Sequence, residues 1–231
     1  MISFFYIHPM KKLYACLIFI LTGIYSFAQV ADLPEAEETH SYWGAGFGYY
    51  FLPMASVKAH YNEMGVAAKG QTMMMGVGID RGYNTITSKL DHGITGLLSF
   101  HYLLPLEFKS PGDSVKVTLN GYNAQFDLLG ANFLKSDILT LTGSLGWAFG
   151  RIKTTEETLA GKASFLNKYF APEARFEFNV RMADHFYLGL RYAYRADITK
   201  TGWNRTGVNT KDLPATNMSG TMLGAFIGYG K

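Results

Sequence analysis

Apolar side chains recur at every second position in several segments of this chain. In one segment the alternating apolar residues are Trp43, Ala45, Phe47, Tyr49 and Phe51, separated by Tyr or Gly. A later segment repeats the pattern with Leu139, Leu141, Leu145, Trp147 and Phe149. Successive side chains of a strand point to opposite faces, so this period predicts strands with one apolar face and one small or polar face.

The same period predicts eight strands along the chain. They span about residues 42–52, 71–81, 95–108, 119–133, 138–152, 167–180, 186–197 and 219–229. Each is close to the roughly 10 residues that a tilted membrane strand needs. Residues 135–137 and 181–185 are short connections, whereas 153–164 and 198–218 are long and polar. This alternation is typical of a membrane barrel with short inner turns and long outer loops.

Two connections leave the number of strands open at eight or ten. Residues 82–93 are too many for a short inner turn and have room for a further strand, and residues 53–70 have room for another. Pro105 raises a separate question, because it falls within the third predicted strand. Proline interrupts a strand ladder and a closed barrel has no edge, so we expect a bulge or a strand end there.

An export signal precedes the strands. Lys11 and Lys12 form a positive start, residues 13–27 are largely apolar, and Ser26-Phe27-Ala28 is a small-x-small cleavage site. We expect residues 1–28 to be removed, residues 1–9 being an over-called start before Met10. The apolar run is too short to span a bilayer, which takes roughly 20 residues. Residues 29–40 then form a short periplasmic segment, and residues 41–231 form the barrel.

Composition agrees with a lipid-facing surface. Charged residues make up 17% of the chain, below the typical ~25%, and no other segment approaches a transmembrane helix. Removal of the signal lowers the formal charge from +3 to +1, so we expect no nucleic-acid partner. It also removes Cys16, which excludes a disulfide or a cysteine nucleophile from the mature chain. We therefore predict an all-β fold, a closed antiparallel up-and-down transmembrane β-barrel, in which every backbone donor is paired.

Three stretches resemble a known family. The signal end Phe27-Ala28-Gln29, the run Tyr-Leu-Leu-Pro-Leu at 102–106 and the late hairpin 174–194 are similar to the PorT-like and OmpA/OmpX-like small outer-membrane β-barrels. The resemblance implies a barrel of eight to ten strands in a Gram-negative outer membrane, and no common catalytic residues. It also implies outer-membrane lipid and the barrel assembly machinery as partners. The chain departs from the pattern at its end, where Gly230 and Lys231 follow Tyr229.

Charged residues alternate on the inward faces of the sixth and seventh predicted strands. Since a tight turn joins these strands, Glu173 and Glu177 can face Arg191 and Arg195 across the ladder. We predict one connected network in the lumen, made of Glu173, Arg175, Glu177, Arg191, Arg195, Asp127 and Glu107. An eight-stranded barrel is only wide enough to be filled by side chains. The leading hypothesis is thus a structural or interaction protein that binds a protein or surface ligand through its outer loops, and the alternative is a narrow channel for small solutes or ions.

A membrane lipid-modifying enzyme is a second alternative. Ser99 and His101 share one face of the third strand, and a histidine base can activate a serine hydroxyl as a nucleophile. This face is inward, away from lipid, and no third member is assignable, so we expect no hydrolase or acyltransferase activity. The His residues lack ligand spacing, and we expect no metal and no cofactor.

The strand phase also predicts which aromatic side chains face lipid. Tyr and Trp concentrate at membrane–water interfaces, so several of these residues are expected in interfacial girdles. The predicted set is Trp43, Phe47, Trp147, Phe149, Tyr192, Tyr194 and Tyr229.

Overall fold

The alternating segments form long antiparallel strands in the computed structural model, which describes residues 38–66, 72–87, 90–135, 138–198, 201–207 and 212–230. The expected export signal lies outside these ranges. The strands are β1 (Glu38–Leu52), β2 (Thr72–Thr87), β3 (Leu90–Lys109), β4 (Val115–Lys135), β5 (Leu139–Thr158), β6 (Gly161–Ala183), β7 (Phe186–Arg195), β8 (Asn204–Gly207) and β9 (Gly220–Gly230). One α-helix, α2 (Ala55–Glu63), and one 3-10 turn, η1 (Pro111–Asp113), accompany them in the described ranges.

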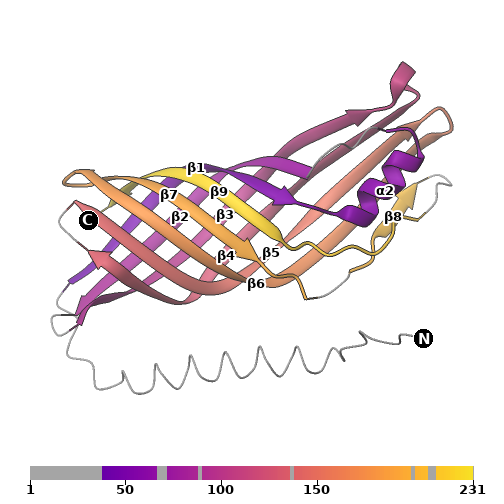
Figure 1. Ribbon diagram of the computed structural model, residues 1–231. Helices are drawn as coiled ribbons and strands as arrows, with labels where there is room; N and C mark the ends of the chain where they lie inside the picture. The colour runs from indigo at the N-terminus through magenta and orange to yellow at the C-terminus, as the bar shows by residue number, and fades with distance from the viewer. Residues whose placement is uncertain are drawn as a thin grey trace, which may run out of the picture.

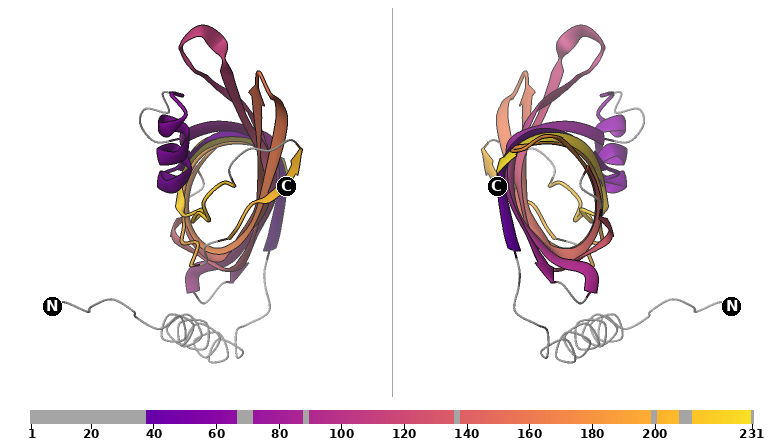
Figure 2. Two further views of the ribbon diagram at one scale, coloured as in Figure 1. Left: turned by 90° about the vertical axis from the view of Figure 1, so that its right-hand side faces the viewer. Right: turned by 90° about the vertical axis from the view of Figure 1, so that its left-hand side faces the viewer.

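Eight of these strands close into a barrel. Their order is β5-β4-β3-β2-β1-β9-β7-β6, and β5 also pairs with β6, which joins the two ends of the sheet. All the pairings are antiparallel, and the strands form a ring when viewed along the barrel (Figure 2). β8 lies outside this closed ladder and pairs only with one end of β6. The predicted closed barrel of eight strands is confirmed.

The two ends of the barrel differ. One end carries the connections between β2 and β3, β4 and β5, and β6 and β7, together with the end of β9; we call it the turn end. The other carries α2, η1, β8 and the connection between β5 and β6; we call it the loop end (Figure 1). Strands β3 to β6 have 20–23 residues each and extend farthest at the loop end.

Neither proposed extra strand is present in the described residues. β2 runs to Thr87 and β3 starts at Leu90, so the described residues of the segment 82–93 belong to these two longer strands. The segment 53–70 instead holds α2, whose buried residues Val57 and Tyr61 are four apart and share one face. Within the described segments, no helix has the length and apolarity to cross a bilayer.

The predicted long loop at 153–164 is also a hairpin. β5 continues to Thr158 and β6 begins at Gly161, with register pairs running from Lys153–Leu166 to Thr158–Gly161. The sequence predicts a loop here because the residues are polar and lie beyond the apolar part of the strands. The barrel wall therefore extends past the segments whose outer face is apolar.

Pro105 marks a bulge, as predicted. The register between β3 and β4 shifts between Leu103 and Leu106, and a bulge reverses which side chains face inward beyond it. Before the bulge Leu103 is buried inside; after it Leu106 and Phe108 pack against the core and Glu107 is exposed. An unbroken period of two from Leu98, Phe100 and Tyr102 would predict that Leu106 faces outward, and the bulge makes that prediction wrong.

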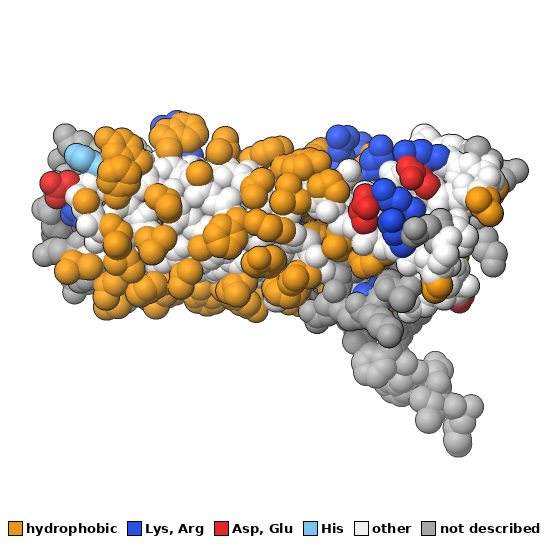
Figure 3. Space-filling view, turned by 90° about the horizontal axis from the view of Figure 1, so that it is seen from above, with side chains coloured by type: hydrophobic (Ala, Val, Ile, Leu, Met, Phe, Trp, Pro, Cys, Tyr) orange, Lys and Arg blue, Asp and Glu red, His pale blue; other side chains and the backbone are white. Residues whose placement is uncertain are grey.

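The outer surface between the two ends is apolar. Hydrophobic side chains are spread over the left and middle parts of the face in Figure 3, and charged side chains gather toward its two ends. Six of the predicted lipid-facing aromatics have exposed side chains, from Trp43 at 57% to Phe149 at 38%. Trp147 is half-buried because it stacks on the exposed Phe170, with ring centroids 4.6 Å apart.

Candidate functional site: the barrel lumen

Charged and polar side chains fill the middle of the barrel. The alternation on β6 and β7 points Glu173, Arg175, Glu177, Arg191 and Arg195 inward, and each is at most 6% exposed. Because buried charges are costly unless they are paired and hydrogen-bonded, the contacts of these groups decide what the site can do.

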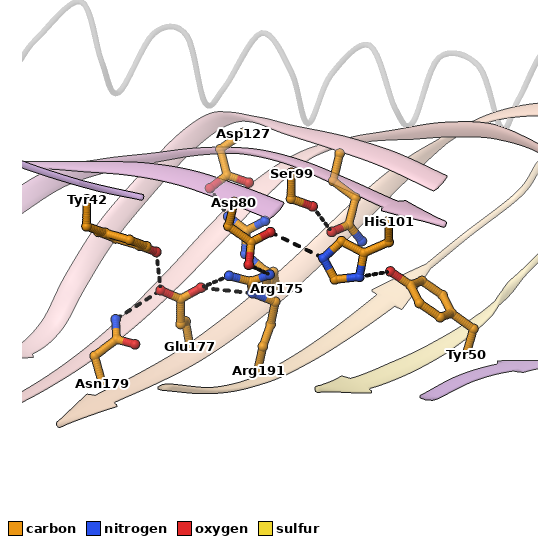
Figure 4. A network of polar contacts seen from close by, with 11 residues as sticks. Tyr42, Tyr50, Asp80, Ser99, His101, Asp127, Arg175, Glu177, Asn179 and Arg191 are labelled. Atoms are coloured by element: carbon orange, nitrogen blue, oxygen red, sulfur yellow. Dashed lines mark hydrogen bonds and ion pairs between the residues drawn. The ribbon is translucent and has the colours of Figure 1, made fainter. Parts of the chain in front are cut away.

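Arg191 lies at the centre of the largest group of contacts (Figure 4). Its Nε donates to Glu177 Oε2 at 2.9 Å and its Nη1 donates to Asp80 Oδ2 at 3.1 Å. Glu177 is its direct cross-strand partner, whereas Asp80 reaches it from β2. The guanidinium also lies 4.7 Å from the centroid of the Phe226 ring on β9. One cation thus links its own strand β7 to three others and balances two carboxylates.

Glu177 has two further donors. The Tyr42 hydroxyl and the Asn179 side-chain amide each donate to its Oε1 at 2.9 Å. The Tyr42 ring stacks on Phe226, with centroids 5.7 Å apart. With these contacts, both oxygens of the buried carboxylate are satisfied.

Asp80 continues the chain of contacts toward the loop end. His101 Nε2 lies 3.2 Å from Asp80 Oδ1, and His101 Nδ1 lies 2.9 Å from the Tyr50 hydroxyl. Ser99 turns away from this histidine, because its hydroxyl donates to Gln125 Oε1 at 2.9 Å. Ser99 and His101 therefore share a face without the nucleophile–base hydrogen bond that serine catalysis requires.

Arg195 forms a second group. It donates to Asn123 Oδ1 at 2.6 Å and to Glu173 Oε2 at 3.3 Å. Tyr169 also donates to Asn123 Oδ1 at 2.7 Å, and Arg195 lies 4.6 Å from the centroid of its ring. Here a neutral amide and an aromatic face complete the surroundings of the ion pair.

Arg175 and Asp127 form a third group, an ion pair between β6 and β4. The direct hydrogen bonds and ion pairs of the described residues do not join the three groups. The direct contacts therefore form three groups, and the coupling of all these residues into one network stays a prediction. The charged residues of β6 select partners on different strands, so the contacts run across the lumen as well as along one ladder.

Glu107 does not belong to the lumen. Its side chain is 47% exposed and its Oε1 lies 2.9 Å from Lys116 Nζ on β4. The bulge at Pro105 is the reason, because it turns Glu107 to the outer face. Asp80, in contrast, faces the lumen, as the strand phase predicts, whereas Asn123 and the rings of Tyr42, Tyr169 and Phe226 belong to the site and were absent from the predicted set. Their positions, which alternate with the outward-facing residues of the same strands, could have predicted that they face the lumen.

Glycines on the inner face make room for the lumen rings. A Cβ at Gly189 would lie 2.1 Å from a ring carbon of Phe226, and a Cβ at Gly82 would lie 2.2 Å from the Tyr42 ring. Both distances are far shorter than a van der Waals contact. The glycine-rich inner faces are thus a packing device, as the alternation of small and large residues suggests.

An apolar cluster closes the lumen toward the loop end. We call it the apolar plug; its members on the strands include Tyr50, Leu52, Met74, Leu103, Leu119, Ile152, Phe165 and Met222. Leu213 and Met218, from the connection before β9, and Val57 and Tyr61, from α2, pack into the same cluster. Leu103, Met74 and Ile152 are fully buried. The lumen therefore has a charged half and an apolar half, both filled by side chains.

The residues described by the structure contain no group of three or more His, Cys, Asp or Glu that could hold a metal ion. The lumen carboxylates are occupied by arginine, tyrosine, asparagine and histidine side chains. The arrangement is thus suited to holding the barrel wall together through buried ion pairs.

Of the comparisons with known proteins, only the one with solved structures finds similar proteins. No protein-family model and no curated protein matches the chain. Similar solved structures include the attachment invasion locus protein Ail of Yersinia pestis, with 13% identity and a TM-score of 0.48 over 84% of this chain and 99% of that one. The outer membrane protein OprG of Pseudomonas aeruginosa has 9% identity and a TM-score of 0.45 over 87% and 99%. Neisserial surface protein A has 11% identity and a TM-score of 0.41 over 85% and 99%.

Proposed function

We propose that this protein is an exported outer-membrane β-barrel with a sealed lumen, which acts at its loop end as a structural or interaction protein. The observation that carries the proposal is the filling of the lumen. Buried ion pairs occupy its middle, and the apolar plug occupies the part nearer the loop end. A barrel of eight strands leaves space for little more than such side chains.

The outer surface supports the membrane placement. Leu190, Ile227 and Leu98 are all more than half exposed on strands of the closed barrel. Water would make such a surface costly, whereas lipid would not. The expected export signal at residues 1–28 is consistent with this route to the outer membrane.

The loop end supports the interaction role. The β3–β4 and β5–β6 hairpins project beyond the barrel, and α2 and β8 lie beside them (Figures 1 and 2). β8 pairs with β6 through four register pairs, from Ala163–Gly207 to Leu166–Asn204. These elements form a structured outer surface, suited to binding a protein or another ligand, while the barrel itself would contact outer-membrane lipid and the assembly machinery.

The geometry argues against a serine enzyme, because the Ser99 hydroxyl donates to Gln125 while the two ring nitrogens of His101 face Tyr50 and Asp80. Lipid A from cells with and without the protein should therefore have the same mass spectrum. A change in acylation that disappears in a Ser99→Ala variant would contradict this part of the proposal.

Conductance separates a sealed barrel from a channel. The protein is folded into detergent, its folding is checked by a heat-modifiable gel shift, and it is inserted into planar bilayers. We expect no stable conductance steps, with an open porin as the positive control. Steady, reproducible steps from the folded protein would replace the sealed barrel with a narrow channel. Failure to show any gel shift would overturn the membrane barrel itself.

A further inference from the structure

Three cationic side chains lie together on the outer face of the barrel wall near the loop end. Arg151 and Lys153 are on β5 and Lys168 is on β6, and all three side chains are exposed. Arg151 and Lys168 are direct cross-strand partners. Lys153 is two residues along from Arg151 and so points to the same face.

This arrangement is unfavourable in the free protein. Like charges directly opposite each other on a sheet repel, and here no ion pair offsets them within the described residues. Two neighbouring cations, in contrast, form ion pairs: Lys116 Nζ lies 2.9 Å from Glu107 Oε1, and Lys162 Nζ lies 2.6 Å from Glu157 Oε1. The uncompensated trio therefore indicates an anion that arrives from outside the chain.

The level of the trio indicates which anion. Two residues before Arg151 on the same face is Phe149, and two residues after Lys168 is Phe170, which stacks on Trp147. Two residues of a strand span about 7 Å, so the cations lie just past the aromatic end of the apolar band. In Figure 3 as well, Lys and Arg side chains gather at the loop end, past the hydrophobic surface. This is the level of lipid headgroups.

The trio is confined to one side of the barrel. On β1, β2, β7 and β9, the outward residues at the loop ends of the strands are Phe51, Met73, Tyr194 and Thr221. None of these four residues is charged. In the described residues, cations therefore do not encircle the barrel at this level, as they would if they bound headgroups without preference for a position. The placement is that of a localised site.

We propose that Arg151, Lys153 and Lys168 bind the phosphate groups of a lipid in the outer leaflet of the membrane. The proposal rests on the outer-membrane placement proposed above. Arg151 lies 4.9 Å from the centroid of the Tyr122 ring on β4, which orients its guanidinium fork. The fork can donate two hydrogen bonds to one phosphate. The lysine ammonium groups can donate to the remaining oxygens of that phosphate or to a second phosphate.

Native mass spectrometry of the folded barrel in a non-ionic detergent tests this site. The probes are lipid A carrying two phosphates, one phosphate or none. The wild-type protein should retain the doubly phosphorylated lipid best and the unphosphorylated lipid least. Each basic residue near a charged membrane surface changes binding by about fivefold, so the triple variant Arg151→Gln/Lys153→Gln/Lys168→Gln should lose roughly a hundredfold.

A matched control lies on the same hairpin. Lys162→Gln removes one charge that is already paired with Glu157, so it should leave lipid retention within about twofold of wild type. Lys168→Gln alone should weaken retention while leaving the unfolding midpoint in urea unchanged or higher, because it relieves repulsion with Arg151. A site that only stabilises the fold would show the opposite change in stability.

Three results would overturn the proposal. One is equal retention of the doubly phosphorylated lipid by the wild-type and triple-variant barrels. Another is equal retention of lipids with two phosphates and with none. The third is binding of a soluble sulfated polysaccharide, such as heparin, without any preference among the lipids. A heat-modifiable gel shift in every sample shows that these are failures of the site, whereas its loss in the wild type is a failure of the barrel.

Discussion

The two halves of the lumen are filled by different kinds of side chain, which are buried for different physical reasons. In the charged half, Arg191, Glu177 and Asp80 are buried because each satisfies the others. In the apolar plug, Leu103, Met74 and Ile152 are buried because their side chains fill the space. A change in the first half leaves a charge without a partner, whereas a change in the second leaves a cavity. The comparison teaches that the charged half determines which side chains pair across the lumen, whereas the apolar plug fills the lumen by packing.

Arg191→Ala should have the largest effect on stability. It leaves Glu177 and Asp80 buried without their cation, and breaking a buried pair costs about 3–5 kcal/mol. Urea unfolding of the folded protein, followed by the gel shift, measures the change. Replacing both Glu177 and Arg191 with neutral residues should cost less than the sum of the single changes.

The separation of the contact groups provides a control for this double-mutant cycle of Glu177 and Arg191. Asp127 pairs with Arg175, and no direct contact joins it to Arg191. The effects of Arg191→Ala and Asp127→Asn should therefore add to within about 0.5 kcal/mol. Strong coupling between them, or none between Glu177 and Arg191, would contradict the assignment of the groups.

Leu103→Ala should lower the stability by less than Arg191→Ala, because it leaves a cavity and not an unpaired charge. The residue is fully buried in the apolar plug, and truncation of a buried leucine costs about 3 kcal/mol through lost burial and the cavity. The same urea titration measures it. Leu103→Met, which keeps the volume, should cost under about 1.5 kcal/mol; an equal loss for both variants would mean that packing does not form the seal.

Leu190→Arg tests the other side of the wall. Leu190 is 58% exposed on β7, one residue before Arg191, so the two neighbours report on lipid and lumen. An arginine near the middle of the bilayer should cost about 2–4 kcal/mol. Unfolding from lipid vesicles, with Leu190→Phe as the control, measures the cost. No effect of Leu190→Arg would mean that this face is not in lipid.

Glu156→Gln should have the smallest effect, confined to α2. Glu156 is on β5 beyond Lys153, outside the membrane-spanning part of the strand, and burial raises the pKa of its carboxyl above the ordinary 4.5. His60 Nε2 of α2 lies 3.9 Å from its Oε1, and Tyr61 of α2 and Arg205 of β8 also interact with it. A raised pKa means that the protonated form is favoured in the fold.

The stabilisation from Glu156 is therefore complete below about pH 4.5 and is lost as the pH rises through the higher pKa of the folded protein. We expect α2 amides to be better protected from hydrogen exchange at pH 5 than at pH 8 in the wild type. Glu156→Gln should reduce that difference, after correction for the intrinsic exchange rates. A pH dependence that is identical in the variant would assign it to other groups.

The period of two explains how much of the fold could be predicted. It placed Tyr192 outside and Arg191 inside, because alternation holds along any unbroken strand. It failed beyond Pro105, since a bulge reverses the phase and turns Glu107 outward. It also missed the extension of β5 and β6, because outside the lipid-facing band the outer face becomes polar.

The partners inside the lumen were harder to predict than the faces. Glu177 and Arg191 follow from the tight hairpin between β6 and β7. The contact between Arg191 and Asp80 joins residues 111 positions apart, and it depends on how the barrel closes. Side-chain lengths across a closed lumen, which alternation does not specify, decide such contacts.

A crystal structure of the folded protein that resolves ordered water tests the sealed lumen most directly. Arg175 Nη1, Arg195 Nε and the amide nitrogens of Asn123 and Gln125 are buried without a protein partner, so we expect isolated waters beside these groups. We also expect none between Leu103, Met74 and Ile152. That result supports a lumen closed by ion pairs and an apolar plug. A continuous file of waters that passes Arg191 and leaves through the loop end would contradict it.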